Sequence, residues 1–203
     1  PYFRDHDIES SRDLVEEIAR VYGYHRLPSV LPTGEIPVSK ADRGLVAEGR
    51  IKEMMLGAGF NEVITYSFVS ASSIQKIGFD KSRALKLWNP LTADYEYMRT
   101  SLVPSVLEAI DKNQENFSEV KIFEIANVYY PRKNDLPKEE LNFVAAVSVK
   151  SGESPFYGAK GLFELFASRF AVSGLALRRG APDASYWHPG RSAVVTLGAD
   201  AVG

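Results

Sequence analysis

Four carboxylates near the start of the chain have the spacing of a metal site. Asp13, Glu16 and Glu17 stand at positions i, i+3 and i+4, so one face of a helix would carry all three. Asp7 precedes that helix and could fold back toward its start. Hard oxygen ligands of this kind suit Mg²⁺, which needs few carboxylates and keeps several waters. The alternative is that acids gather at a helix N-terminus because the macrodipole stabilises them, and on spacing alone we prefer this alternative.

The other residue types that support catalysis form no recognisable site. His6, His25 and His188 are far apart in the sequence, and none belongs to a Ser/His/Asp motif or has the spacing of a metal-ligand pair. Residues 158–161 combine glycine with lysine but match neither the P-loop nor the dinucleotide fingerprint, so we interpret them as a turn. The chain has no cysteine, which excludes disulfides, thiolate metal sites and a cysteine nucleophile.

The composition is that of a soluble globular protein. Hydrophobic residues make up 45% of the 203 residues, and the formal net charge of −2 gives no basic footprint for broad nucleic-acid binding. No apolar run approaches the roughly 20 residues that span a bilayer, and no signal peptide is visible. We therefore expect no membrane partner and a cytoplasmic location. The abrupt start at Pro1 and the unfinished-looking end at Gly203 indicate a piece cut from a longer polypeptide.

The acidic residues belong to a predicted N-terminal helix. Ser10 and Asp13 fit a capping box, with Asp in place of the usual Glu, and Gly23 is a natural helix stop. Residues 27–37 contain too many prolines and glycines for a regular element, so they are interpreted as a linker. We place a domain boundary near Val38.

The rest of the chain reads as a mixture of strands and helices. The expected elements are, in order, a helix from Ser39 or Asp42 to Gly57 or Gly59, a strand at 62–69, a short helix at 72–77, a short strand at 85–88, a turn at Asn89-Pro90, a helix capped by Ser101, a long strand at 121–130, a strand at 141–149, a loop at 155–161, a helix at 162–170, and strands at 175–178 and 193–197. Strands outnumber helices and there is no strict βαβ alternation. This order favours an α+β fold in which a mainly antiparallel sheet carries helices on one side.

Short motifs run through the chain in the order found in one family. They are Asp13-Leu14-Val15-Glu16-Glu17-Ile18-Ala19-Arg20, Tyr22-Gly23-Tyr24, Thr65-Tyr66-Ser67-Phe68, Asn89-Pro90-Leu91, Met98-Arg99-Thr100-Ser101-Leu102, Ile122-Phe123-Glu124-Ile125 and His188-Pro189-Gly190-Arg191-Ser192. The ordered set covers nearly the whole chain and resembles the β subunit of phenylalanyl-tRNA synthetase. The loop, helix and long strand over residues 87–130 also look like the centre of a class II aminoacyl-tRNA synthetase fold.

The resemblance implies an α₂β₂ heterotetramer that uses ATP to charge tRNA(Phe) with phenylalanine. The α subunit would carry the active site, so ATP would bind only there. Residues 39–203 would be a catalytic-like but inactive class II core, truncated at its C-terminus. Residues 1–38 would be the end of a winged-helix-like domain together with the proline-rich linker.

The resemblance also implies why the core would be inactive. Class II synthetases place an arginine on the long central strand, where it grips the ATP α-phosphate through charge-assisted hydrogen bonds. The strand that looks equivalent has Glu124 after Ile122-Phe123. A carboxylate there would repel the phosphate, so no catalytic residue and no cofactor-binding residue is assigned to this chain.

Two further sites are carried over from the family. Its acidic pattern Asp-x₅-Asp-x₂-Glu-Glu is reproduced by Asp7, Asp13, Glu16 and Glu17, which implies Mg²⁺ shared with the α subunit. The helix over residues 42–56 resembles the first class II motif, which normally makes the subunit interface. Its apolar face, formed by Ile51, Met54 and Met55, is therefore expected to pack against the α subunit.

Two other functions stay open beside the inert supporting subunit. One is a self-sufficient class II domain that activates an amino acid itself, which ATP–pyrophosphate exchange by the isolated protein would reveal. The other is a small nucleic-acid-binding module based on the N-terminal helix, which the acidic net charge disfavours and a salt-dependent DNA titration would test.

Overall fold

The computed structural model describes residues 2–4, 7–36, 38, 40–150, 155–179, 187–188 and 191–201. His6 and Ser39 lie outside the described residues. Internal contacts divide the chain into two compact units, Pro1–Lys40 and Ala41–Gly203. The division falls close to the boundary expected near Val38. The domain identities assigned to the two sides stay predictions.

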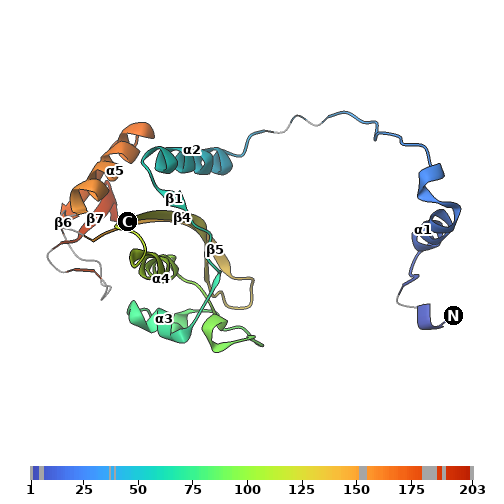
Figure 1. The fold of residues 1–203 in the computed structure, drawn as a ribbon, viewed down its shortest axis with the longest axis horizontal. Coiled ribbons are helices and arrows are strands. Elements are labelled where there is room, and N and C mark those ends of the chain that lie inside the picture. Colours follow the sequence, from blue (N-terminus) through green and yellow to red (C-terminus); the bar gives the residue numbers. More distant parts are fainter. Residues whose placement is uncertain are drawn as a thin grey trace. The chain divides into compact units, whose positions relative to one another are not determined.

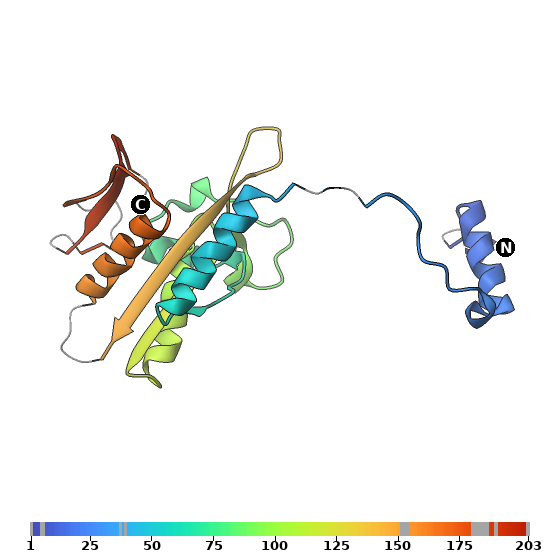
Figure 2. The ribbon, with the colours of Figure 1, turned by 90° about the horizontal axis from the view of Figure 1, so that it is seen from above.

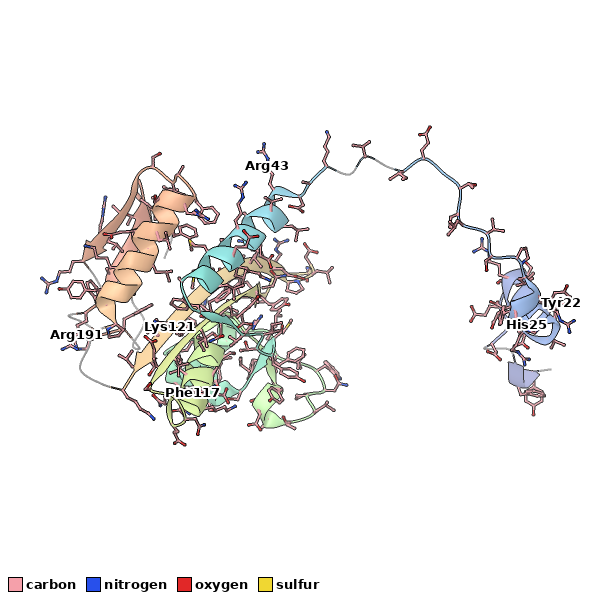
Figure 3. The ribbon with its side chains drawn as sticks, turned by 45° about the horizontal axis from the view of Figure 1, so that its top comes forward. Tyr22, His25, Arg43, Phe117, Lys121 and Arg191 are labelled. Atoms are coloured by element: carbon pink, nitrogen blue, oxygen red, sulfur yellow. The ribbon has the colours of Figure 1, made fainter. Side chains whose placement is uncertain are left out.

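The first unit contains the predicted acidic helix, α1 (Ser11–Tyr22), with the short 3₁₀ turns η1 (Tyr2–Arg4) and η2 (Tyr24–Arg26) on either side. The predicted capping box is confirmed, because Ser10 accepts from the N–H of Arg12 while the Asp13 carboxylate accepts from the N–H of Ser10. Gly23 ends the helix with φ = 99°. A Cβ at this position would lie 2.7 Å from the ring of His25, which sits at the same end of α1 as Tyr22 (Figure 3). Backbone conformation and space therefore both require glycine here.

The second unit is built around a three-stranded sheet that lies between two layers of helices (Figures 1 and 2). Strands β4 (Glu119–Tyr130) and β5 (Lys138–Val149) pair antiparallel along their whole length, and the short β1 (Asn61–Glu62) runs parallel to β4 on its other side. Helices α2 (Arg43–Gly57) and α5 (Phe156–Arg169) cover one face of the sheet, and α4 (Val103–Gln114) covers the other. The expectation that helices pack on one side only is therefore wrong.

The two-sided cover follows from the sequence of β4, which is apolar on both faces. Phe123 joins Met54, Met55 and Phe60 in the core beneath α2, and the partly buried side chains of α5 pack against this cluster. The neighbouring Ile122 instead joins the core beneath α4. Successive side chains of a strand point to opposite faces of the sheet. A strand with apolar residues at both odd and even positions therefore needs helices on both sides.

A small second sheet lies beside the helix α3 (Ala71–Lys76). This helix confirms the one predicted at 72–77. Strands β2 (Phe68–Val69) and β3 (Tyr97–Met98) pair antiparallel, and Lys86 forms a single bridge to Tyr97. The strand predicted at 62–69 is thus interrupted between β1 and β2, because the chain turns its Thr65 backbone N–H and hydroxyl toward Glu124. The strand predicted at 85–88 is reduced to that one bridge. The 3₁₀ turns η3 (Lys81–Arg83) and η4 (Ala93–Tyr95) complete this region.

Two helix starts differ from the predictions. Helix α4 is capped at Leu102 rather than Ser101, although the Ser101 hydroxyl still accepts from the N–H of Val103 at 3.2 Å. Helix α5 begins at Phe156, so most of the predicted loop at 155–161 is helical, and Ala159 N–H closes the first turn on the Pro155 carbonyl at 2.9 Å. Gly158 and Gly161 weaken the first half of this helix by about 1 kcal/mol each. Packing of the helix on the sheet, through Leu162, Phe166 and Phe170, offsets that cost.

The last described strands form an antiparallel sheet of their own: β6 (Leu175–Arg179), β7 (Ala193–Leu197) and β8 (Asp200–Ala201). The predicted strands at 175–178 and 193–197 are confirmed. None of the helices in the described part of the chain is long and apolar enough to cross a membrane.

Candidate functional site

Glu124, the residue expected to disable a nucleotide site, is buried in the middle of β4. Its side chain is only 1% exposed. One carboxylate oxygen accepts from the Thr65 N–H at 3.1 Å and from Arg99 Nη1 at 3.0 Å, and the other accepts from the Thr65 hydroxyl at 2.7 Å. The expectation that Glu124 faces a nucleotide pocket and repels phosphate is corrected. The carboxylate points into the domain, and Arg99 compensates its charge.

Arg99, which follows β3, is likewise enclosed, with 3% of its side chain exposed. Its Nε donates to the carbonyl of Asn127 at 2.9 Å, and its Nη1 donates to the Thr65 hydroxyl at 2.9 Å as well as to Glu124. Longer contacts of 3.4 Å run from Nη1 to the carbonyls of Thr65 and Tyr66. Nε and Nη1 are therefore both used inside the domain, and we name Thr65, Arg99 and Glu124 the buried ion-pair cluster.

Backbone hydrogen bonds hold the buried ion-pair cluster in place. Arg99 donates its N–H to the carbonyl of Ser67 at 2.9 Å, and its carbonyl accepts from the N–H of Tyr129 at 2.9 Å. The cluster therefore ties the segment before β2, the end of β3 and the centre of β4 to one another. Because each charge has a partner and hydrogen bonds, the cluster meets the condition under which charged groups are tolerated in a protein interior.

Sequence reasoning assigned no role to Arg99, although one signal was present. A glutamate between Phe123 and Ile125, in a strand apolar on both faces, must be buried, and a buried carboxylate requires a cation or several donors. The signal shows that a partner is needed but does not say which arginine supplies it.

Two hollows on the second unit lie away from the cluster. One, of about 250 Å³, is bordered by the first turns of α2 and by Phe170. The other, of about 350 Å³, lies between α5 and the end of the sheet that carries Lys121 (Figure 3). Lys121 forms an ion pair with Glu119 there at 2.8 Å. Neither is lined by Glu124 or Arg99, so neither corresponds to the nucleotide pocket expected from the sequence.

The methionines assigned to a subunit interface belong to the core of the domain. Met55 is completely buried and Met54 nearly so, both against Phe60 and Phe123, with Ile51 partly buried beside them. The expectation that Met54 and Met55 contact an α subunit is therefore corrected, because this chain alone already covers both side chains. The exposed apolar residues of α2 are instead Leu45, Val46 and Leu56.

Asp13 and Glu17, two of the acids of the predicted metal site, form contacts within the first unit. The Asp13 carboxylate accepts from the backbone N–H groups of Glu9 and Ser10 and from the Ser10 hydroxyl, and the Glu17 carboxylate pairs with Arg20 at 2.5 Å. Over the described residues, no three His, Cys, Asp or Glu side chains come together as a metal site. The oxygen donors suit Mg²⁺ chemically, but their placement in this chain alone does not form a site.

The cap at Asp13 leads to a prediction about pH. Hydrogen bonds from the Ser10 backbone, the Ser10 hydroxyl and the Glu9 backbone hold the pKa of Asp13 below its ordinary value of 3.8. The cap's contribution is therefore complete above that ordinary pKa and is lost as the pH falls through the lower folded-state value. A side-chain NMR titration should place the midpoint below 3.8, and Ser10→Ala should raise it part of the way back. An unchanged midpoint in Ser10→Ala would contradict the assignment of the hydroxyl.

Comparison with known proteins identifies the family. The family described as "Phenylalanyl tRNA synthetase beta chain CLM domain" matches residues 27–203. The chain belongs to this phenylalanyl-tRNA synthetase β-chain family. It is similar to the protein named phenylalanine–tRNA ligase beta subunit from Syntrophus aciditrophicus, with 34% identity over all of this chain and 27% of the relative. It is also similar to the protein of that name from Geobacter metallireducens, with 31% identity over 97% of this chain and 26% of the relative.

The β-chain relatives are considerably longer than this chain, which spans about a quarter of their length. Among solved structures, a pyrrolysyl-tRNA synthetase, PylSc of Desulfitobacterium hafniense, matches 97% of this chain and 62% of its own chain, with a TM-score of 0.63 and 15% identity. At that identity the likeness shows the fold alone. The mixed α and β architecture of this β chain is thus the fold of a tRNA synthetase.

Proposed function

We propose that this chain is a non-catalytic core of the β subunit of phenylalanyl-tRNA synthetase. It would support an α subunit, within an α₂β₂ heterotetramer, in the ATP-dependent charging of tRNA(Phe) with phenylalanine. ATP would bind only at the α-subunit site. Family membership supports the role in the ligase. The buried ion-pair cluster supports the lack of catalysis, because the strand position expected to hold an ATP-binding arginine carries Glu124, a buried carboxylate that pairs with Arg99.

The experiment compares the full-length β subunit, the α subunit and the co-expressed complex in phenylalanine-dependent ATP–pyrophosphate exchange and in tRNA(Phe) aminoacylation. The complex should be active in both assays, and the β subunit alone should show no exchange. Exchange by the β subunit alone would favour a domain that activates an amino acid itself. An α subunit that reaches the rate of the complex without β would rule out the supporting role.

The outer surface of α2 is the part of this helix that can meet the α subunit. Leu45 is 69% exposed, and Val46 is also exposed. Leu45→Glu should prevent co-purification of α with the full-length β subunit, because a charge in an apolar interface is costly to desolvate. The matched control is Leu136→Glu, at an exposed apolar residue in the β4–β5 loop, which should leave co-purification intact. Normal assembly of Leu45→Glu would show that this face of α2 is not the interface.

Mg²⁺ binding is proposed only for the assembled enzyme, in which α would supply the ligands that this chain lacks. Glu16 is the best probe, because Asp13 also caps α1 and Glu17 pairs with Arg20. Glu16→Gln should lower the Mg²⁺ content of the purified tetramer, measured by elemental analysis after gel filtration. Glu9→Gln is the control, since it changes a nearby exposed acid outside the family pattern. Equal metal content in the two variants would contradict the assignment.

A further inference from the structure

Four apolar side chains stand exposed around the loop over residues 88–95. We name Tyr66, Trp88, Leu91 and Tyr95 the aromatic patch. Trp88 is 99% exposed and Leu91 fully exposed. The rings of Tyr66 and Tyr95 stack at 5.3 Å with planes 29° apart. Exposed apolar residues gathered in this way, and tryptophan and tyrosine above all, mark surfaces that another molecule covers.

The structure beneath the aromatic patch anchors the base of its loop and the residue next to Tyr66. The loop is closed at its base, where the N–H of Leu87 donates to the carbonyl of Glu96 at 2.8 Å. Tyr66 follows Thr65, whose backbone and hydroxyl are fixed by the buried ion-pair cluster. Because Thr65 points inward, the extended chain directs its neighbour Tyr66 outward. The Tyr66 and Tyr95 rings, which already stack on each other, would lose less side-chain entropy on being covered than freely rotating side chains.

The charges around the patch favour a protein occupant over nucleic acid. Residues 87–96 contain no lysine or arginine but two acids, Asp94 and Glu96. Lys86, next in the chain, is paired with Glu96 at 3.0 Å. Platforms that stack bases also need cations to hold the phosphates. Asp94 and Glu96 would repel the phosphates of a nucleic acid.

We propose that the aromatic patch docks another domain of the same β-subunit polypeptide. The relatives are long enough to contain such a domain, since about three quarters of their length lies outside the part that matches this chain. The position of the patch agrees, because its loop lies with α3 below the sheet in Figure 1, on the side of α4. The opposite side carries α2, which the proposed function reserves for the α subunit. The inference rests on the proposed function in this respect only.

The test replaces Trp88 with the photoreactive residue p-benzoylphenylalanine in the full-length β subunit, co-expressed with α. Illumination of the tetramer should give a cross-linked species with the mass of a single β chain, and mass spectrometry should find a peptide from outside residues 1–203. A cross-link to α, to a second β chain or to added tRNA would overturn the proposal. Failure of α to co-purify at all would count against the proposed function instead, and the cross-link would then be read on β alone.

Hydroxyl-radical footprinting of the unsubstituted tetramer measures the exposure of the aromatic patch without any substitution in the protein. Oxidation of Trp88 and Tyr66 should be lost relative to the unfolded protein, and it should also be lost in the β subunit without α. If Trp88 is oxidised as fast as in the unfolded chain, or is protected only after α is added, the inference is wrong.

Discussion

Arg99→Met is expected to lower the free energy of unfolding of this chain by about 3–5 kcal/mol, the usual cost of removing one member of a buried ion pair. The substitution leaves the buried Glu124 carboxylate without its cation. It also removes the donors that reach Asn127 and the Thr65 hydroxyl. Urea denaturation followed by far-ultraviolet circular dichroism measures the change.

A surface pair and a double variant control this experiment. Lys112→Met breaks the exposed ion pair with Glu108, and a surface pair of this kind contributes little to stability because solvent screens it. Arg99→Met combined with Glu124→Leu removes both charges and should recover most of the lost stability, since replacing both members of a buried pair is often neutral. If Arg99→Met costs no more than Lys112→Met, the cluster does not hold the three segments together.

Met55→Ala is expected to cost about 2–5 kcal/mol in the same assay, because it removes a completely buried side chain and leaves a cavity. Met55 packs with Phe60 and Phe123, so the loss falls on the contact between α2 and the sheet. The expected effect is on the stability of the isolated chain, with no partner present.

The adjacent Leu56 provides the comparison. It is exposed on the same helix, so Leu56→Ala should change the stability by no more than about 0.5 kcal/mol. Should Met55→Ala leave the isolated chain as stable as the parent and only reduce co-purification of α, Met55 would be an interface residue after all, and its placement in the core would be wrong.

These two predictions bear on the proposed function. Arg99 uses Nε and Nη1 on Asn127, Thr65 and Glu124 inside the domain, so neither nitrogen is free to meet a phosphate. The buried cation and anion of this domain neutralise each other without a ligand. In the proposed function, such a body would carry surfaces for other chains and domains, among them the outer face of α2 and the aromatic patch.

Local signals in the sequence determined much of the fold. Ser10 and Asp13 fixed the start of α1 and Gly23 its end, because caps act within one turn of helix. The long runs of β-branched and aromatic residues likewise indicated β4 and β5. The order of the short motifs indicated the family, which the comparison confirmed.

Tertiary structure alone decided how the apolar and charged residues were used. The periodicity of α2 showed that Met54 and Met55 share a face, but only the packed fold shows that this face meets the domain's own Phe123. Glu124 finds Arg99 25 residues away in the chain and Thr65 59 residues away. Pairing over such separations depends on which strands lie side by side, and propensities that act over a few residues cannot specify it. The sequence therefore identified the carboxylate, and the fold decided that an arginine would neutralise it.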